Sequence, residues 1–240
     1  MTGLGWRGGA AARAPGVLTA ALEAFLAPQS CPGCGTRVAA AAFLCGDCER
    51  RLPPLADPLC VRCLLEDREP AGCRRHPAGA RAVAPWTYDE RMALVVQALK
   101  FGARPELAAR YAPAIARALP RGYRPDMVIP VPLHAARRRE RGYDQAALLA
   151  DALGRAIGAP HVPGLLARVR ATRAQTGLSG ARRRANLAGA FAAPRPEAVR
   201  GRRVLVVDDV LTTGATLDAA LAALRAAGAR PLGAALAWAA

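Results

Sequence analysis

Residues 204–217 read VLVVDDVLTTGATL, and no other stretch of the chain is as informative about its chemistry. The aliphatic run at 204–207 is typical of a short strand buried in a parallel sheet. The run ends in two adjacent carboxylates, Asp208 and Asp209, and a loop rich in hydroxyl groups follows. Leucines at helical spacing come next, at positions 217, 221 and 224. The order predicts a strand, an acidic pair, a loop and the N-terminus of a helix.

The loop after the acidic pair has the composition of a phosphate site. Its residues are Thr212, Thr213, Gly214, Ala215 and Thr216. Backbone N–H groups converge at the start of a helix, threonine hydroxyls add donors, and the helix dipole favours an anion. Gly214 permits a positive φ and a close backbone approach. Two carboxylates beside this loop would repel a second phosphate but accept hydrogen bonds from sugar hydroxyls, so the implied ligand is a ribose 5-phosphate.

An ordinary strand followed by a capped helix is the alternative to a ligand site, with Thr213 or Thr216 as the N-cap. That alternative accounts for the aliphatic run and for one threonine, but it gives no reason for two carboxylates at a strand end. A P-loop is excluded, because the segment contains no lysine and lacks the glycine–lysine spacing of that motif.

With 240 residues, the chain is long enough for one medium-sized domain with a proper core and one small module. It is strongly basic, with a formal net charge of +16 and Lys100 as its only lysine. Residues 131–200 carry 13 arginines against 4 aspartates and glutamates. Such a surplus predicts an anionic partner, either pyrophosphate or nucleic acid, and the alternative is a solvated basic face.

The apolar stretch at residues 16–27 contains Glu23 and is too short to span a bilayer. Arginines precede it, as in a signal peptide, but the internal glutamate and the cysteines beyond it disfavour that interpretation. We expect an amphipathic helix packed on the protein, no membrane insertion and a cytoplasmic location.

All seven cysteines fall between residues 31 and 73, and they form two sets. The first set consists of two Cys-x-x-Cys pairs: Cys31, Cys34, Cys45 and Cys48. The second set consists of one such pair, a third cysteine and a histidine: Cys60, Cys63, Cys73 and His76. Paired knuckles suit tetrahedral zinc, because each directs two thiolates at one metal. We therefore predict two structural zinc sites, since a fully ligated zinc has no open position for catalysis.

Three other interpretations of the cysteines compete with zinc binding. Disulfides fit poorly, because the number of cysteines is odd and the rest of the chain has an intracellular character. A redox Cys-x-x-Cys at Cys31 and Cys34 lacks a preceding strand that would place it in a βαβ unit. Buried cysteines without a metal remain the alternative for Cys60, Cys63 and Cys73.

Residues 127–132, MVIPVP, predict a second strand that ends in prolines. The loop at its end consists of Val131, Pro132, Leu133 and His134. An arginine cluster that includes Arg137, Arg139 and Arg141 follows and opens a helix predicted to run to about residue 157. Guanidinium groups bind phosphate oxygens in bidentate fashion, so this strand end is a candidate pyrophosphate site. His134 is either a general base or pyrophosphate contact, or a histidine whose ring is satisfied by backbone groups.

The segment 172–191 is polar and arginine-rich at its start. We interpret residues 172–179 as a mobile loop. Arg182, Arg183 and Arg184 form a basic patch that is a candidate nucleic-acid contact, since the arginine surplus exceeds what one pyrophosphate needs.

Several separated motifs resemble those of a known family. The segment 204–217 is similar to the signature loop for phosphoribosyl pyrophosphate in type I phosphoribosyltransferases. From Cys31 onward, nearly all of the chain resembles the competence protein F family, through VPLH at 131–134, RGYDQ at 141–145, QTGLS at 175–179, and Arg183, Asn186, Leu187 and Phe191. The cysteines resemble that family's double zinc ribbon. Two positions depart from the pattern: His76 stands where a cysteine is common, and Asp144 where an asparagine is usual.

The resemblance implies an α/β fold with a type I phosphoribosyltransferase-like parallel sheet flanked by helices, preceded by a small zinc-ribbon module. The strand–helix alternation from residue 81 onward agrees with this fold class. We expect an N-terminal helix or tail over residues 1–29, a double zinc ribbon over 30–80 and the phosphoribosyltransferase-like domain over 81–240. A module as small as the ribbon needs its metal to fold.

The resemblance also implies phosphoribosyl pyrophosphate and Mg²⁺ as ligands. Asp208 and Asp209 would then hold the ribose hydroxyls and favour the positive charge that develops at the anomeric carbon. The loop 212–216 would hold the 5-phosphate, and the loop 131–134 with nearby arginines would receive pyrophosphate with Mg²⁺. The family's role implies DNA uptake in natural transformation, with single-stranded DNA and competence-machinery proteins as partners. Two hypotheses stay open: an active phosphoribosyltransferase of unspecified acceptor, and a non-catalytic single-stranded-DNA-handling protein that retains the fold and ligand site.

Overall fold

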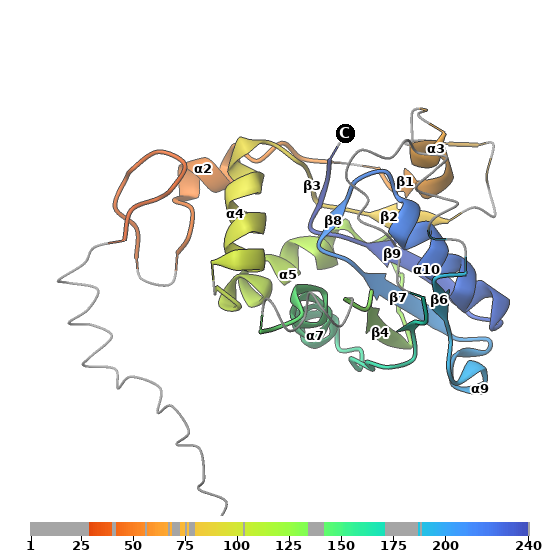
Figure 1. Ribbon diagram of the computed structural model, residues 1–240. Helices are drawn as coiled ribbons and strands as arrows, with labels where there is room; N and C mark the ends of the chain where they lie inside the picture. Colours follow the sequence, from red (N-terminus) through yellow and green to blue (C-terminus); the bar gives the residue numbers. More distant parts are fainter. Residues whose placement is uncertain are drawn as a thin grey trace, which may run out of the picture. The chain divides into compact units, whose positions relative to one another are not determined.

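The computed structural model of the chain (Figure 1) describes residues 29–39, 42–55, 57–66, 68, 73–74, 76, 80–102, 104–133, 142–170, 187 and 189–239. The chain divides into two compact units, Met1–Glu49 and Arg50–Ala240, and each is described by itself. The amphipathic helix predicted at 16–27 and nearly all of the predicted tail lie outside the described residues. The boundaries predicted after residues 29 and 80 remain predictions.

In the first unit the described chain turns back on itself around the first cysteine pair. Ser30 and Arg37 form an antiparallel bridge. Inside this bridge the N–H of Gly35 donates to the carbonyl of Cys31 over 2.8 Å. Gly35 has a φ of +76°, so the tight turn after Cys34 requires a residue that tolerates the left-handed region. Helix α2 (Gly46–Arg50) begins directly after Cys45 and contains Cys48.

The second unit is built on a five-stranded sheet with the order β1-β2-β9-β7-β4. Its strands are β1 (Leu59–Cys60), β2 (Arg81–Val83), β9 (Arg230–Ala234), β7 (Arg203–Val207) and β4 (Met127–Pro130). Only the edge pair β1–β2 is antiparallel, and the other three pairs are parallel. The predicted α/β class with a mainly parallel sheet is therefore confirmed.

Three strands of this sheet break and then resume as a second, parallel sheet. Its strands are β3 (Trp86–Thr87), β10 (Ala237–Trp238) and β8 (Val210–Leu211), and they follow β2, β9 and β7 along the chain. Both sheets keep the same neighbour order, so the three breaks lie side by side. The break between β7 and β8 is the acidic pair, Asp208 and Asp209. A separate antiparallel pair joins β5 (Ala167–Arg168) to β6 (Phe191–Ala192).

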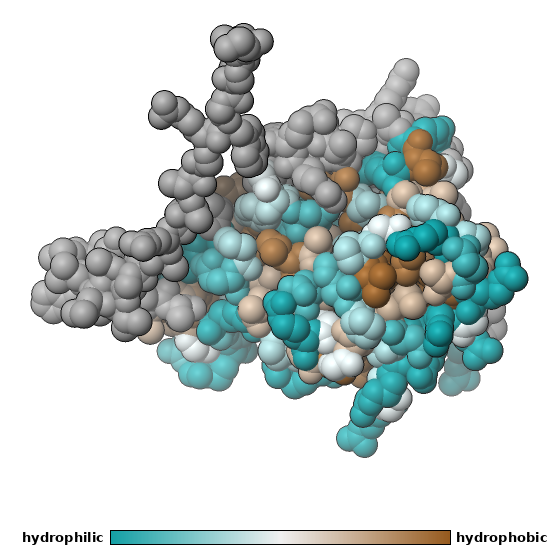
Figure 2. Space-filling view, turned by 90° about the horizontal axis from the view of Figure 1, so that it is seen from below, coloured by the Kyte–Doolittle hydropathy of each residue, from teal (hydrophilic) through white to brown (hydrophobic). Residues whose placement is uncertain are grey.

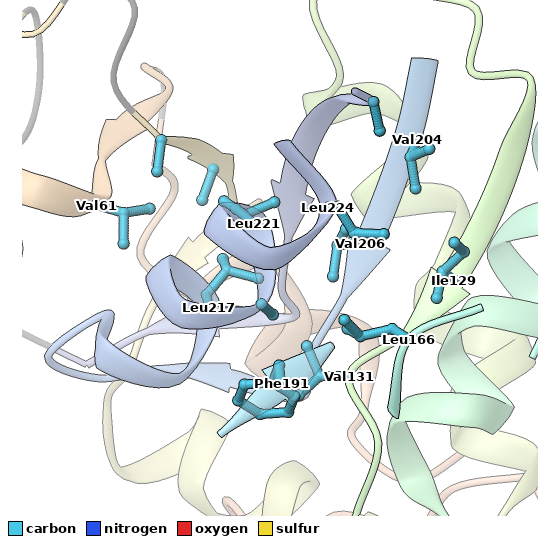
Figure 3. Packing of buried hydrophobic residues seen from close by; sticks show 14 of the residues in the cluster. Val61, Ile129, Val131, Leu166, Phe191, Val204, Val206, Leu217, Leu221 and Leu224 are labelled. Atoms are coloured by element: carbon cyan, nitrogen blue, oxygen red, sulfur yellow. The ribbon is translucent and has the colours of Figure 1, made fainter. Parts of the chain in front are cut away.

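Helices cover both faces of the parallel sheet. On one face, α10 (Ala215–Ala226) contacts β9 and β7, and its leucines at 217, 221 and 224 pack with Val204 and Val206 (Figure 3). Successive strand side chains point to opposite faces, so the equally buried Leu205 and Val207 point to the other face. There α7 (Gln145–Ile157) packs on β4 and β7, and α5 (Glu106–Ala118) packs on α7. The helix predicted from the leucine spacing is confirmed, and the three leucines are buried in the core.

The remaining helices lead into and out of these layers. Helix α4 (Glu90–Phe101) starts at the N-cap Asp89, whose carboxylate accepts from Met92 N–H over 2.8 Å. Two short helices complete the unit: α3 (Val61–Leu65), which follows β1 directly, and α9 (Pro196–Val199), which precedes β7. Helix α7 ends at Gly158, which has a φ of +69° and forms a left-handed cap, in agreement with the predicted end near residue 157.

The surface of the described residues is predominantly hydrophilic on the face seen from below, with apolar residues in small separate patches (Figure 2). Among the helices that the structure describes, none is both long enough and apolar enough to cross a lipid bilayer.

Candidate functional site

The acidic pair lies in the strand break at the carboxyl end of β7. The N–H of Asp208 donates to Ala234 O over 2.9 Å, and the carbonyl of Asp209 accepts from Leu236 N–H over 3.0 Å. The first hydrogen bond reaches Ala234, the last residue of the neighbouring strand β9, and the second reaches Leu236, two residues further on. The backbone of the pair is therefore fixed by the sheet, which leaves its side chains to act at the sheet edge.

Asp209 is buried, with 7% of its surface exposed, and both of its carboxylate oxygens have partners. Lys100 Nζ lies 3.1 Å from Oδ1, and Gln145 Nε2 donates to Oδ2 over 2.8 Å. The buried negative charge is thus balanced by the only lysine of the chain, as burial of a carboxylate requires. Neither partner was assigned a role from the sequence. Lys100 stands at the end of α4 and Gln145 at the start of α7, far from residue 209 in the chain.

Asp208 differs from its neighbour in electrostatics. Burial raises the pKa of its carboxyl to about 7, and the negative charge of Asp209 adds to the effect. The N–H of Asp209, which donates to Asp208 Oδ1 over 2.8 Å, and the ammonium of Lys100 oppose this rise. Two adjacent carboxylates in one partly dry site cannot both ionise at low cost, so Asp208 is the member that takes up a proton.

Thr212, Thr213 and Gly214 join β8 to α10, and Ala215 and Thr216 form the start of the helix, so the predicted order of loop and helix N-terminus is observed. Thr212 is exposed, and Thr213 and Thr216 are half-buried. The residue that precedes the helix is Gly214, with a φ of +76°, and it supplies no capping side chain. The alternative in which Thr213 or Thr216 is the N-cap is therefore wrong. An anion at this helix start would meet N–H groups that a side-chain cap does not occupy.

The loop after β4 lies beside the acidic pair. The parallel register pairs Pro130 with Val207, and Val131 N–H donates to Val207 O over 2.8 Å. Val131 is buried, while Pro132 and Leu133 are half-buried. Because parallel strands end at the same edge of a sheet, the candidate pyrophosphate loop and the acidic pair share one edge.

Asp144 organises this loop. Its carboxylate caps α7 by accepting from Ala147 N–H over 3.1 Å, and its other oxygen accepts from Leu133 N–H over 3.4 Å. Both roles need only an acceptor, so the aspartate performs them without the amide of an asparagine. The following residue, Gln145, bonds to Asp209, and one short segment therefore connects the candidate pyrophosphate loop to the acidic pair.

Several predicted contacts fall on residues outside the described ranges. These are His134, Arg137, Arg139 and Arg141 of the candidate pyrophosphate site and Arg182, Arg183 and Arg184 of the predicted basic patch. The predicted loop 172–179 also lies outside them. Their roles remain predictions.

The first cysteine set converges in the first unit. The four Sγ atoms of Cys31, Cys34, Cys45 and Cys48 all lie within 4.8 Å of one another. Cys34 Sγ and Cys45 Sγ are 3.6 Å apart. Thiolates bound to one tetrahedral zinc at about 2.3 Å lie about 3.8 Å from each other, so this donor set and spacing fit zinc.

The second set converges in the other unit, next to the main sheet. Cys63 Sγ lies 3.3 Å from Cys73 Sγ, and His76 Nδ1 lies 3.6 Å from Cys60 Sγ. All four ligand atoms again lie within 4.8 Å of one another. The other ring nitrogen of His76, Nε2, faces Glu66 Oε1 at 3.9 Å. A carboxylate behind a histidine is the arrangement that orients zinc-binding imidazoles, so the cluster fits zinc with Nδ1 of His76 as the fourth ligand.

The zinc content of the parent and of single cysteine variants should distinguish the two metal clusters. We expect about two zinc ions per chain by elemental mass spectrometry, one for each tetrahedral ligand set. Cys31→Ser should remove only the zinc of the first cluster, and Cys60→Ser only that of the second. A parent protein with a single zinc that survives Cys60→Ser would contradict the second site.

Asp208→Asn should stabilise the ligand-free protein in a pH-dependent way. The folded protein keeps a proton on Asp208 up to about pH 7, whereas the unfolded chain releases it near the ordinary value of 3.8. The parent therefore loses stability as pH rises through this window, and asparagine cannot ionise. The gain in free energy of unfolding should grow across the window to about 2–4 kcal/mol above pH 7.

Urea unfolding of parent and variant at pH 4 and pH 8 measures this gain. Asp151→Asn, a change in the ion pair of Asp151 with Arg155 on α7, is the matched control and should show no comparable growth. An equal effect of Asp208→Asn at both pH values would contradict the raised pKa.

Comparison with known proteins identifies both parts of the chain. The phosphoribosyl transferase domain family matches residues 108–240, and the double zinc ribbon domain family matches residues 22–75. Among solved structures, the allosteric regulatory enzyme of purine biosynthesis aligns with a TM-score of 0.39 and 24% identity over 58% of this chain and 30% of that chain.

Several known proteins are similar to this chain over most of its length. Competence protein F of Haemophilus influenzae is 33% identical over 195 residues, which cover 78% of this chain and 80% of that protein. DNA utilization protein YhgH of Salmonella typhimurium is 33% identical over 193 residues, covering 78% and 74%. The same protein of Escherichia coli K12 is 31% identical with the same coverage. The double zinc ribbon thus precedes the phosphoribosyl transferase domain in this chain, and the chain belongs to the competence protein F family.

Proposed function

We propose that the chain binds phosphoribosyl pyrophosphate with Mg²⁺ at the edge formed by the ends of β4 and β7. One observation carries the proposal: the acidic pair in the break between β7 and β8 is followed, after the two residues of β8 and a short loop, by a helix start without a side-chain cap. The match of residues 108–240 to the phosphoribosyl transferase domain family supports the same ligand.

Each part of the ligand has a complementary part of the site. The 5-phosphate binds to N–H groups and hydroxyls of Thr212–Thr216 at the start of α10. The ribose hydroxyls donate to Asp208 and Asp209. The pyrophosphate lies against the loop of Val131, Pro132, Leu133 and His134, with Arg137, Arg139 and Arg141 as its cationic contacts.

Lys100 gives the site a cation that can follow the ligand. In the ligand-free protein it neutralises Asp209 from 3.1 Å. A ribose hydroxyl that donates to Asp209 displaces the ammonium group, whose long, flexible side chain then reaches the incoming phosphate oxygens. Gln145 keeps its hydrogen bond to the other oxygen of Asp209 and so holds the carboxylate in place.

The carboxylates also fit Mg²⁺, which prefers oxygen ligands and binds through one or two carboxylates together with substrate phosphates. Asp208 and Asp209 are the residues of this chain that would hold it. When bound, the ion neutralises charge on the departing pyrophosphate. For a nucleophile that reaches the anomeric carbon, displacement of pyrophosphate passes through an oxocarbenium-like state, which the acidic pair stabilises electrostatically.

Removing both carboxylates should abolish most of the ligand affinity. For Asp208→Asn combined with Asp209→Asn, isothermal titration with phosphoribosyl pyrophosphate and Mg²⁺ should give binding weaker by about 2–4 kcal/mol, because charge-assisted hydrogen bonds in a partly dry site are lost. Thr213→Val should weaken binding less, through phosphate contacts alone.

The matched control for this titration is again Asp151→Asn, which changes a carboxylate on the outer part of α7 and should bind as the parent does. If the double variant binds as tightly as the parent, the acidic pair does not hold the sugar.

Single-stranded DNA is a second candidate ligand, supported by the arginine surplus of residues 131–200 and by relatives named for competence and DNA utilization. In this role the protein handles incoming DNA together with competence-machinery proteins and retains the phosphoribosyl pyrophosphate site without turnover. The cytoplasm is the compartment we propose, because it keeps thiolates reduced for zinc.

Salt dependence distinguishes phosphate contacts from a merely solvated basic face. The logarithm of single-strand affinity should fall linearly with the logarithm of salt concentration, by about 0.7 per phosphate contact, because counterions are released. Replacing Arg182, Arg183 and Arg184 by alanine should flatten that slope and leave the zinc content unchanged. Absence of single-strand binding at low salt by the zinc-loaded protein would refute this function.

A further inference from the structure

The second metal cluster is part of the main sheet of its unit. Cys60 is the last residue of the edge strand β1 and pairs with Arg81 of β2. The guanidinium of Arg81 in turn donates to the carbonyl of Cys73 over 2.7 Å. Two ligands of the cluster are therefore tied to the same strand of the sheet.

Helix α3 connects this cluster to the proposed 5-phosphate site at residues 212–216, called the phosphate loop below. It begins at Val61, between the ligands Cys60 and Cys63, and Val61 N–H donates to Ala80 O over 3.0 Å. Val61 is fully buried and belongs to the core cluster that contains Ala215 and Leu217 of α10. Figure 3 shows its side chain beside α10, near Leu217 and Leu221.

The contact is closest at Gly214. A Cβ atom on this glycine would lie 2.7 Å from Val61 Cγ1, 3.2 Å from Val61 O and 3.5 Å from Leu64 Cβ. Separations this short leave no room for a side chain, and the φ of +76° independently favours glycine. The sequence assigns Gly214 to the approach of a phosphate, and the structure shows in addition that α3 packs against this glycine.

We propose that metal at Cys60, Cys63, Cys73 and His76 holds the phosphate loop in its binding conformation, with Val61 as the positioning residue. Helix α3 has five residues and is too short to be stable alone, so its geometry depends on the ligands at Cys60 and Cys63. Loss of the metal releases α3, and the loop loses the wall against which Gly214 packs.

Metal occupancy and phosphate binding are therefore coupled, and the coupling acts in both directions. The loop conformation is a property of the protein alone, whereas the effect on affinity rests on the proposed function. The proposal concerns the second cluster, which lies in the same compact unit as the phosphate loop, whereas the first cluster belongs to the other unit.

Hydrogen exchange tests the coupling without any ligand. In the zinc-loaded full chain, Val61→Ala keeps all metal ligands and should leave the zinc content at the parent value. Exchange in residues 211–221 should nevertheless become about ten-fold faster, because opening of the loop and first turns of α10 becomes easier. Cys73→Ser, which removes a ligand of the second cluster, should accelerate the same segment.

Two variants serve as controls. Val199→Ala removes the same atoms from a fully buried valine of the same core, but at α9, which precedes the amino end of β7. Cys34→Ser removes a ligand from the first cluster. Neither should accelerate exchange in residues 211–221 relative to the parent.

A second experiment, with phosphoribosyl pyrophosphate and Mg²⁺, measures the ligand affinity and the effect of bound ligand on zinc release. Val61→Ala should weaken binding of phosphoribosyl pyrophosphate with Mg²⁺ about five- to ten-fold, and saturating ligand should slow transfer of zinc from the second cluster to a chelator in the parent. Failure of the parent to bind this ligand would refute the proposed function and leave the exchange test to decide the coupling. Exchange in Val61→Ala equal to that in Val199→Ala would overturn the coupling, whether or not the ligand binds.

Discussion

The parallel pairing of β7 with β4 on one side and β9 on the other is the constraint on which the candidate site depends. It brings the carboxyl ends of β4 and β7 to one edge, where Val131 N–H bonds to Val207 O. The break after β7 then places Asp208 and Asp209 at that edge, with their backbone held by residues 234 and 236. Candidate ligand-binding residues that are far apart in the sequence become neighbours because the strands run in the same direction.

Charge is the second constraint, because a buried carboxylate must be compensated. Asp209 obtains a cation from Lys100 and a hydrogen bond from Gln145, while Asp208 responds by a pKa raised to about 7. The ligand-free site thus carries less negative charge than its sequence indicates, which reduces repulsion of an anionic ligand. The second metal cluster is connected to the same loop, because Val61, which stands between its ligands Cys60 and Cys63, packs against Gly214.

Local patterns predicted much of this structure. The aliphatic run and the leucine spacing around residues 204–224 predicted β7 and α10. The Cys-x-x-Cys pairs predicted both metal clusters. Each of these patterns is contained in a short segment of sequence. Contacts between distant segments had no such signal. Lys100 lies in the last turn of α4, more than 100 residues before Asp209, and the fold brings the two side chains together. The contact of Val61 with Gly214 likewise depends on how β1 joins the sheet.

We claim that the acidic pair and the start of α10 form one ligand site, and that the second metal cluster holds the phosphate loop of this site in place through Val61. A crystal structure of the zinc-loaded protein with phosphoribosyl pyrophosphate and Mg²⁺, with data collected at the zinc absorption edge, tests it most directly. We expect an anomalous peak among Cys60, Cys63, Cys73 and His76, with the 5-phosphate at Thr212–Thr216 and the ribose against Asp208 and Asp209. A ligand bound elsewhere, or a phosphate bound at this loop with no metal in the second cluster, would contradict the claim.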